Sequence, residues 1–532
     1  MLDWISAAAA KAAIHGAQEC ALLDIREHGQ YGEGHPFLSV HCPYSDFEQS
    51  VQLLVPNTAS SVILMDDGDG LAQKAASQMV AMGYTQVCAL QGGAAAWAAA
   101  GYTLYQGVNL PSKTLGELVE HAHHPQLVSA QTLRSWQSEG RGFHFFDCRP
   151  PSEYAKMTVP GAACVPNGEL AHRLAAVVPD DDLPIVVTCA GRTRGLIGAA
   201  GLALLGLNRP VFALENGTQG WALAGLALQR GNGLPDMPEL KPKQLALSRQ
   251  RADGLIQAQS LSCIGRETFL DLAADLNRTL YLVDVRSAAE FRRGHLPGAQ
   301  HAWSGQIAQA ADLSLGVRRA RVVLCDDTGL RAALAAVWLR MLGYEVFIWR
   351  ETSPDALQAH WRLNKPQLPS APPLRTLSAA EVADSLRSGK YGLLDLRPSQ
   401  AYRQSHIEGA NWISRARLNH DPALSGRAQA WVLMAPDALS AAYTALDLRQ
   451  LGLAVHGVFT GSLSELQARG CQCVSTPKNP PDADCIDFLF FVHDRHDGNL
   501  ESAKRYLSWE MGLIAQLDEA ERASFCLTKN PA

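Results

Sequence analysis

Four short apolar runs in this 532-residue chain end in the same polar pattern, an aspartate and an arginine separated by one residue. The pairs are Asp24 and Arg26, Asp147 and Arg149, Asp284 and Arg286, and Asp395 and Arg397. Apolar runs of this length are typical of strands that are buried on both faces of a parallel sheet. The aspartates lie 123, 137 and 111 residues apart, which is the usual size of a domain.

A second apolar run follows each of these strands and leads into a segment rich in alanine and leucine. The runs read SVILM, PIVVT, RVVLC and AWVLM, and the segments behind them end near Gly83, Gly206, Gly343 and Gly452. Strands that alternate with helices of about 10 to 15 residues are typical of βαβ units, in which helices cover both faces of a parallel sheet. The pattern therefore predicts an α/β fold in which one unit occurs four times.

The repeats predict four domains, at residues 1–125, 126–240, 255–365 and 372–475, followed by a helical extension at 476–532. Proline-rich stretches, GNGLPDMPELKP and NKPQLPSAPPL, mark the second and third joints. A closing motif that contains tryptophan is clear in the first two copies, as LQGGAAAWAAAG and LENGTQGWALAG. It is loose in the third and fourth copies, as WRETSPDALQAHW and FTGSLSELQARG.

The combination of motifs resembles the rhodanese-like sulfurtransferase family. The hallmarks of that family are Asp-x-Arg after the first strand, a Gly-His-Ile/Leu-Pro-Gly-Ala turn, a cysteine-headed loop before a helix, and a Gly-Gly-x-x-x-Trp ending. VDVRSAAEFRRGHLPGA and LQGGAAAWAAAG match three of these closely, and the resemblance covers roughly residues 1–475. It implies tandem rhodanese-like domains in which a cysteine takes a sulfane sulfur from a donor, holds it as a persulfide and passes it to a thiophilic acceptor, without a cofactor or a metal.

Only the second copy has a cysteine at the head of that loop. Cys189 lies 17 residues before the glycine that ends its helix, and the same interval in the other copies leads to Asp66, Asp326 and Ala435. Cys325, in VVLCDDTG, comes one position too early, and a shift of one residue in a strand turns a side chain to the opposite face. We therefore interpret Cys325 as structural and the first, third and fourth copies as inactive.

The loop CAGRTR in the second copy combines a nucleophile with features that bind anions. A thiol reacts as the thiolate, and the N–H groups of a tight loop at a helix N-terminus favour that anion, so a lowered pKa is expected for Cys189. The resemblance implies that Cys189 is the nucleophile, that the loop amides hold the persulfide, and that Arg194 supplies the main charge for the donor. The predicted substrate-binding residues are Ala190, Gly191, Arg192, Thr193, Arg194 and Arg149.

Two other functions remain open at this point. Cysteine phosphatases with a related fold have an arginine six positions after the cysteine, where this chain has Gly195. A scaffold without catalytic activity, which docks a sulfur carrier or another protein, is the second hypothesis. The intact loop at Cys189 favours the sulfurtransferase over both.

Some polar residues near the predicted site have a structural alternative. The second copy has Thr158 where the third and fourth copies have His295 and His406, which leaves the role of that histidine undefined. Asn167 and Glu169 are candidates for the donor pocket, but a role at the start of a helix explains them equally well. Arg149 is expected to face the loop, and the alternative is that it only forms a salt bridge with a neighbouring carboxylate.

The composition narrows the range of partners. A formal net charge of −6 argues against nucleic acid or an anionic membrane surface, and no apolar span reaches the length that crosses a membrane. The 12 cysteines are scattered within apolar runs and form no CxxC pair, which favours free thiols in a reducing compartment over a zinc site. No signal-peptide pattern is visible, so we expect a cytoplasmic protein. Its expected partners are a small-molecule sulfur donor, a thiol or cyanide acceptor and, as a further candidate, an acceptor protein.

The extension after residue 475 does not belong to the repeat. Its predicted amphipathic helix has an apolar face made of Leu500, Ala503, Tyr506, Leu507, Trp509, Leu513, Ile514 and Leu517. The polar cluster from His493 to Asp497 is interpreted as the approach to this helix, with a cap at Asp497 or Asn499. If the extension folds over the second copy, the cluster could line its active site.

Overall fold

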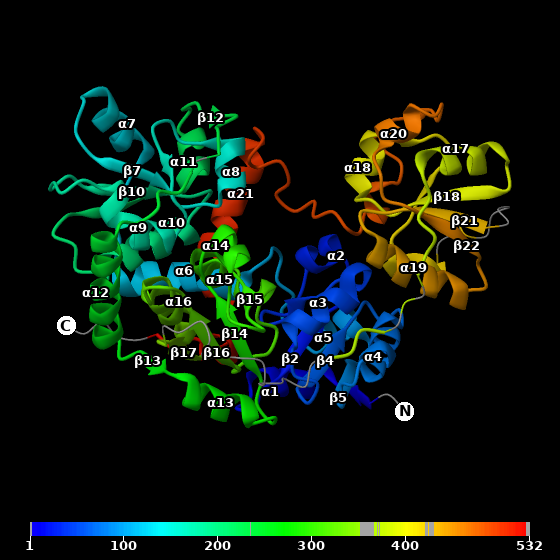
Figure 1. Cartoon of the computed structure of the whole chain (residues 1–532), viewed down its shortest axis with the longest axis horizontal. Helices are drawn as coiled ribbons and strands as arrows, with labels where there is room; N and C mark the ends of the chain where they lie inside the picture. Colours follow the sequence, from blue (N-terminus) through cyan, green and yellow to red (C-terminus); the bar gives the residue numbers. More distant parts are fainter. Residues whose placement is uncertain are drawn as a thin grey trace.

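Four parallel sheets form the framework of the residues that the computed structural model describes, which are 3–234, 236–351, 366–369, 371, 373–420, 424 and 430–527. The first three sheets have five strands each in the same spatial order, β1-β5-β4-β2-β3 in the first unit. The fourth sheet has four described strands, and a parallel bridge between Thr376 and Val458 stands where its first edge strand would pair. The predicted α/β fold with four tandem units is confirmed (Figure 1).

The strands of each sheet are short, and the apolar runs of the sequence form the central ones. The first sheet has β1 Asp3–Ile5, β2 Ala21–Asp24, β3 Val40–His41, β4 Ser61–Met65 and β5 Gln86–Leu90. The second has β6 Gln126–Val128, β7 His144–Asp147, β9 Ala163–Cys164, β10 Ile185–Thr188 and β11 Val211–Leu214. The third has β13 Ser262–Ile264, β14 Leu280–Asp284, β15 Gln300–His301, β16 Arg321–Cys325 and β17 Glu345–Trp349. The fourth has β18 Tyr391–Asp395, β20 Asn411–Trp412, β21 Ala430–Met434 and β22 Val455–Phe459.

The helix after the second central strand recurs in every unit and ends as predicted. These helices are α4 Leu71–Ala81, α10 Thr193–Ala203, α16 Leu330–Met341 and α19 Ala438–Gln450. The glycine just beyond each helix has a positive φ, of 97°, 64°, 88° and 77° in chain order. A left-handed residue turns the chain out of the helix, and glycine adopts that conformation without the steric cost of a Cβ.

The other helices cover the sheets or join the units. Those of the first two units are α1 Ala7–His15, α2 His28–Glu33, α3 Phe47–Leu54, α5 Gly93–Ala99, α6 Leu110–His123, α7 Ala130–Ser138, α8 Pro151–Lys156, α9 Glu169–Val177 and α11 Gly217–Leu223. Helix α12 Pro242–Ala258 leads to the third unit, and the later helices are α13 Arg266–Ala274, α14 Ala288–Arg293, α15 Ser304–Gln309, α17 Ala379–Arg387, α18 Ser399–Gln404 and α20 Leu463–Gln467. The closing motif of the third copy lies outside the described residues from position 352 onward.

The aspartate of each Asp-x-Arg motif binds the arginine two residues later. The distance from guanidinium nitrogen to carboxylate oxygen is 2.6, 2.7, 2.6 and 2.5 Å in the four units. The same arginine donates to a backbone carbonyl eight residues further on, that of Gly34, Met157, Gly294 or Ser405. The motif therefore holds the short helix that follows the strand, and folding explains its recurrence.

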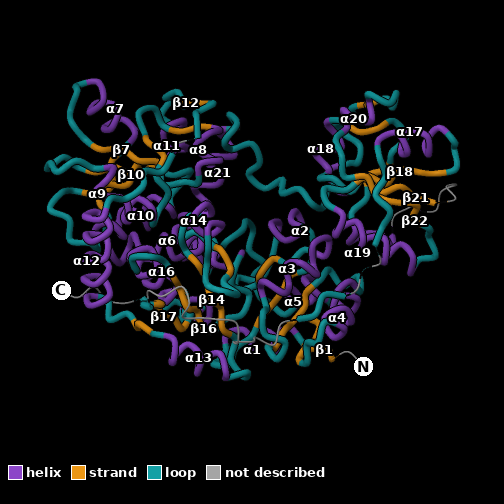
Figure 2. Tube along the Cα trace, viewed as in Figure 1, coloured by secondary structure: helices purple, strands orange, loops and turns teal. Residues whose placement is uncertain are grey.

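The first three units share one hydrophobic core, whereas the fourth has its own. Leu23, Val187 and Leu324, from the first three sheets, belong to a single buried cluster, and Leu433 of the fourth sheet belongs to another. The chain returns from the fourth unit to the second through a long stretch of loop, which Figure 2 shows crossing between the two. The extension then forms α21 Leu500–Met511, α22 Leu513–Gln516 and α23 Glu519–Arg522. Within the described residues, no helix is long and apolar enough to cross a membrane.

Candidate active site

Cys189 follows directly after strand β10, at the head of the loop that leads into α10. In the parallel pairing of the second sheet, Thr188 lies opposite Asp147, and in the third sheet Cys325 lies opposite Asp284. Cys325 is therefore the counterpart of Thr188, the last strand residue, and not of Cys189. Its side chain is buried in the apolar core of the third unit, at the position that the sequence register predicts.

A cavity of about 400 Å³ lies over Cys189, and several separated parts of the chain line it. The main parts are the loop itself, the region of α8, the segment from Gly107 to Lys113 at the start of α6, and the extension between Leu489 and Glu510. Arg230 and Gln309 add one residue each. Cys189 is only 2% exposed. The Cys189 sulfur therefore lies buried beneath the cavity and not on an open sheet edge.

The loop amides do point at the sulfur, but burial decides the net effect on its pKa. Burial raises the pKa of the Cys189 thiol above its ordinary value, against the lowering effect of Arg194 and of the N–H groups of Gly195 and Gly191. The carboxylate of Glu510 raises this pKa further. The expectation of a lowered pKa is therefore wrong for this closed site, because the cost of burying the thiolate exceeds the stabilisation by the loop.

The glycine of the closing motif packs directly against the backbone of the Cys189 loop. Gly217 has a φ of 54°, and a Cβ on it would come within 2.3 Å of the carbonyl oxygen of Cys189. The next residue, Thr218, donates its N–H to that same oxygen at 2.8 Å. In the first unit Gly93 has the same contact with Asp66, at 2.2 Å. Only glycine permits this close approach, so the motif positions the loop.

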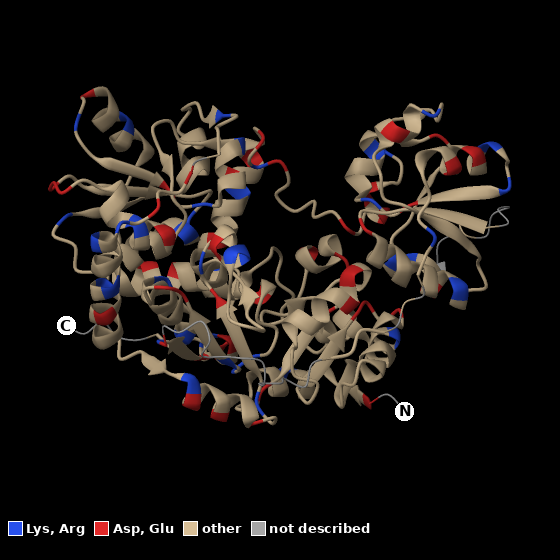
Figure 3. Ribbon diagram, viewed as in Figure 1, with Lys and Arg blue, Asp and Glu red and all other residues tan. Residues whose placement is uncertain are grey.

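The two arginines of the loop are both engaged by glutamates. Two guanidinium nitrogens of Arg194 donate to the two carboxylate oxygens of Glu153, at 2.6 and 2.8 Å. Arg192 forms a similar pair with Glu117, at 2.8 and 2.9 Å, and also binds Glu120. These pairs neutralise most of the positive charge that the loop brings to the cavity. Figure 3 shows acidic and basic positions side by side where α8 and α21 meet.

The remaining pocket candidates of the second unit have different positions. Arg149 lines the cavity, although two of its nitrogens are bound to Asp147. Asn167 donates from Nδ2 to the carbonyl oxygen of Arg194 at 2.7 Å and so supports the loop from outside the cavity. Glu169 begins α9 and binds arginines of α9 and α16, which makes it a residue of the joint between units.

The histidine of the turn motif has a structural role in the units that contain it. His35, His295 and His406 each stack on the aromatic ring four positions earlier, with ring centroids 3.7, 3.8 and 3.7 Å apart. At the equivalent position of the second unit, Thr158 donates from Oγ1 to Asp147 at 2.7 Å. The departure from the family pattern therefore removes no group from the cavity.

The extension folds over the second unit, which was the condition under which its polar cluster was expected to line the site. Helix α21 packs on α6 and α11, with Asn499 as its cap, since the side chain of Asn499 accepts the N–H of Ser502 at 3.0 Å. Of the polar cluster before this helix, Arg495, His496 and Asp497 line the cavity. The site is thus built from residues outside the repeat as well as from the loop.

Glu510 brings a buried carboxylate to the site from α21. Its Oε1 accepts a hydrogen bond from Thr193 Oγ1 at 2.5 Å, and Lys113 Nζ lies 3.9 Å away. Its Oε2 is buried, has no hydrogen-bond partner within the described part of the chain, and lies 3.2 Å from where a Cβ on Gly191 would be. Sequence reasoning missed this residue, although an acidic residue within the predicted apolar face of the helix was a usable signal.

In two other units, an aspartate carboxylate occupies the place of the Cys189 side chain. Asp66 accepts the N–H groups of Gly68 and Ala72 at 2.8 and 2.9 Å. Asp326 accepts the N–H groups of Gly329 and Arg331 at 2.8 and 3.3 Å, which lie at neighbouring positions of the corresponding loop. The loop amides that an anion would use are therefore satisfied by the protein itself.

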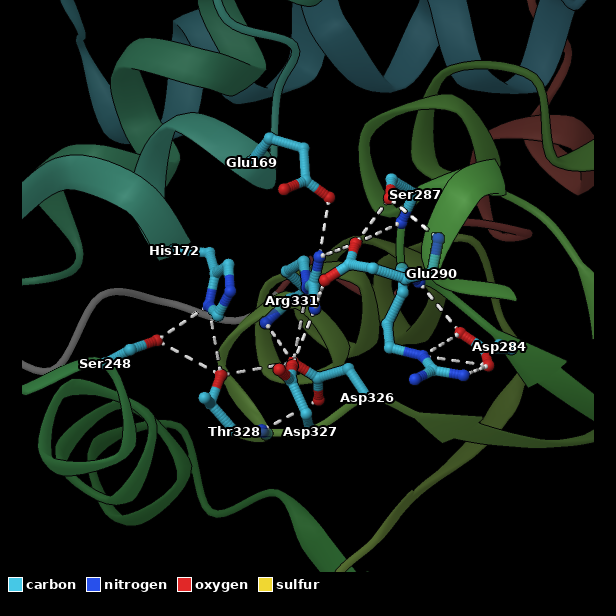
Figure 4. A network of polar contacts seen from close by, with 12 residues as sticks. Glu169, His172, Ser248, Asp284, Ser287, Glu290, Asp326, Asp327, Thr328 and Arg331 are labelled. Carbon is cyan, nitrogen blue, oxygen red and sulfur yellow. Dashed lines mark hydrogen bonds and ion pairs between the residues drawn. The ribbon is translucent and has the colours of Figure 1, made fainter. Parts of the chain in front are cut away.

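The third unit retains the loop arginine, but there this residue is buried at the contact with the second unit. Arg331, the counterpart of Arg194, is fully buried and lies 2.9 Å from Glu290, the counterpart of Glu153. Glu169 of the second unit reaches the same guanidinium at 2.8 Å. Figure 4 shows these carboxylates around Arg331. In the third unit, the loop that corresponds to the Cys189 loop therefore joins two units.

Comparison with known proteins agrees with the repeated architecture. Residues 6–100, 129–224, 267–351 and 378–438 match the family of rhodanese-like domains. The crystal structure of a thiosulfate sulfurtransferase from Pseudomonas aeruginosa has a TM-score of 0.89 and 32% sequence identity, over 99% of this chain and all of the other. An HTH-type transcriptional regulator of Mycobacterium tuberculosis is 38% identical over 105 residues, which are 20% of this chain and 45% of the regulator.

Proposed function

Because the chain belongs to the rhodanese-like sulfurtransferase family, we propose that it moves a sulfane sulfur from thiosulfate or a related donor to a thiol or cyanide through a persulfide on Cys189. The expected setting is the cytoplasm, and an acceptor protein is a further candidate partner. The observation that carries the proposal is the buried Cys189 in a loop whose Gly191 and Gly195 amides face its sulfur, inside a cavity.

The proposed reaction has two displacement steps. The Cys189 thiolate attacks the outer sulfur of the donor, the S–S bond of the donor breaks, and sulfite leaves with the bonding electron pair when the donor is thiosulfate. The acceptor then attacks the terminal sulfur of the persulfide and leaves as thiocyanate or as a new persulfide, which restores the Cys189 thiolate. Such an exchange through a covalent intermediate predicts ping-pong kinetics.

The chain's own groups are suited to hold the charge of the intermediate. A persulfide anion extends from Sγ toward the loop, where the amides of Gly191 and Gly195 face the sulfur and the α10 N-terminus is close. Asp66 supports this role, because its carboxylate accepts the equivalent amides of its own unit, those of Gly68 and Ala72. Asp326 also accepts loop amides in its unit, those of Gly329 and Arg331. The loop is thus a site that an anion of suitable size fills.

The test is cyanide-dependent release of thiocyanate from thiosulfate and from 3-mercaptopyruvate. Cys189→Ser is expected to abolish release, and the matched control Cys325→Ser is expected to retain it. Loss of activity in Cys325→Ser alone would contradict the assignment of the nucleophile. No release by the wild-type chain with either donor, together with no gain of sulfur, would favour the scaffold hypothesis.

A further inference from the structure

Five arginines line the Cys189 cavity, and four of them are bound to carboxylates. Arg149 binds Asp147, Arg192 binds Glu117 and Glu120, Arg194 binds Glu153, and Arg230 lies 3.5 Å from Asp497. Among the described residues, Arg495 has no carboxylate within ion-pair distance. It is the one cavity arginine whose charge is not already used.

The guanidinium of Arg495 is held in place without being neutralised. It stacks on the ring of Tyr506, with Cζ 4.3 Å from the ring centroid. Its single hydrogen bond among the described residues is a long one, from Nη1 to the carbonyl oxygen of Val492 at 3.4 Å, and its Nε is buried without an acceptor. A buried donor without a partner is costly, so this group is ready to bind an anion.

The position of Arg495 relative to the loop fits the geometry of a sulfur donor. The Tyr506 ring that contacts Arg495 also reaches the loop, since its Cε1 lies 3.1 Å from where a Cβ on Gly191 would be. The transferred sulfur must reach Sγ at the loop, and the charged end of the donor must lie further out. One aromatic ring away from the loop, Arg495 is where that charged end would be. The Nδ1 of the neighbouring His496 is buried and has no partner in the described ranges of the chain. Burial lowers the pKa of His496 to about 3, so the ring is neutral and able to share a hydrogen bond.

We propose that Arg495 of the C-terminal extension, and not an arginine of the rhodanese loop, binds the anionic end of the sulfur donor. The proposal rests on the proposed function in taking Cys189 as the residue that the donor reaches. It assigns the donor class as molecules with a sulfonate or carboxylate, which a planar guanidinium binds well. It also explains why the extension must fold over the second unit.

The test compares two alkylating reagents of similar size that differ in charge, iodoacetate and iodoacetamide, on Cys189 of the full-length chain. The rates are followed by mass spectrometry of the Cys189 peptide. A charge-assisted hydrogen bond is worth about tenfold or more in binding, so Arg495→Gln is expected to lower the iodoacetate-to-iodoacetamide rate ratio about tenfold. The control Arg230→Gln, at the half-exposed rim, is expected to change the ratio less than about twofold, because its charge is screened by solvent.

An unchanged ratio in Arg495→Gln would overturn the proposal. If iodoacetamide itself reacts at a different rate in that variant, Arg495→Lys is the deciding variant. A rate ratio of iodoacetate to iodoacetamide that stays at the wild-type value in Arg495→Lys supports the role of the charge. A ratio that falls in Arg495→Lys contradicts it. Because alkylation needs no turnover, the result is independent of the proposed reaction. With turnover, Arg495→Gln is expected to raise the KM for thiosulfate about tenfold and to leave kcat unchanged.

Discussion

Replacement of Glu510 by glutamine tests how the closed site controls the reactivity of Cys189. Glu510 raises the pKa of the Cys189 thiol, and its unpartnered oxygen lies against Gly191 of the loop. At an effective dielectric constant of about 20, the interaction of two nearby unit charges is on the order of a few kcal/mol, and solvent in the cavity reduces it. The pKa of the Cys189 thiol is therefore expected to fall in Glu510→Gln.

The sign of the effect follows from the charge that is lost. Without the carboxylate, the thiolate forms at lower pH, so the rise in alkylation rate with pH shifts to lower pH. Below the pKa, more of the thiol is present as thiolate in the variant, but each thiolate is less nucleophilic, so the rate with iodoacetamide is expected to rise only modestly, by about threefold.

The assay is the rate of alkylation of the Cys189 peptide as a function of pH. Glu501→Gln is the matched control, because it makes the same change at an exposed position of the same helix and is expected to leave the profile unchanged. Glutamine at 510 can still accept the hydrogen bond from Thr193, so the loop is retained. A pKa that stays the same or rises in Glu510→Gln would refute the reasoning.

Three further substitutions test the packing around the site. Gly191→Ala places a Cβ 3.1 Å from Tyr506, so it is expected to lower the thiosulfate reaction rate at least tenfold without loss of secondary structure, as measured by kinetics and circular dichroism. Arg331→Met leaves buried carboxylates unpaired, which lowers the free energy of unfolding by roughly 3–5 kcal/mol. Unfolding in urea is expected to begin at a lower concentration, and the KM for thiosulfate is expected to stay unchanged. Lys11→Met removes the cation 2.7 Å from buried Glu521, so hydrogen exchange is expected to become faster in the extension.

The fold and the register of Cys189 could be predicted because both depend on local patterns. Short continuous apolar runs, glycines at helix ends and the interval from Cys189 to its glycine are properties of single segments. The strand pairing that places Cys325 opposite Asp284 agrees with that interval. The same locality explains why Asp-x-Arg was easy to find, although its role is to hold a helix.

The charges of the site could not be predicted in the same way, because they depend on contacts between segments far apart in the sequence. Arg194 was expected to provide charge for the donor, but Glu153 binds it. The pKa of Cys189 depends on its burial and on the charge of Glu510 in the extension, which no spacing within the loop reveals. Arg495 was recognised only as part of a polar cluster, since its relation to the loop arises from the path of the chain back to the second unit.

The most direct test of the account is the mass of the intact protein and of its Cys189 peptide, before and after exposure to thiosulfate without an acceptor. The account predicts a gain of one sulfur atom on the Cys189 peptide, which cyanide removes. The gain is expected in the wild type and in Cys325→Ser and is absent in Cys189→Ser. A sulfur found on another cysteine, or a gain that persists in Cys189→Ser, would contradict the account.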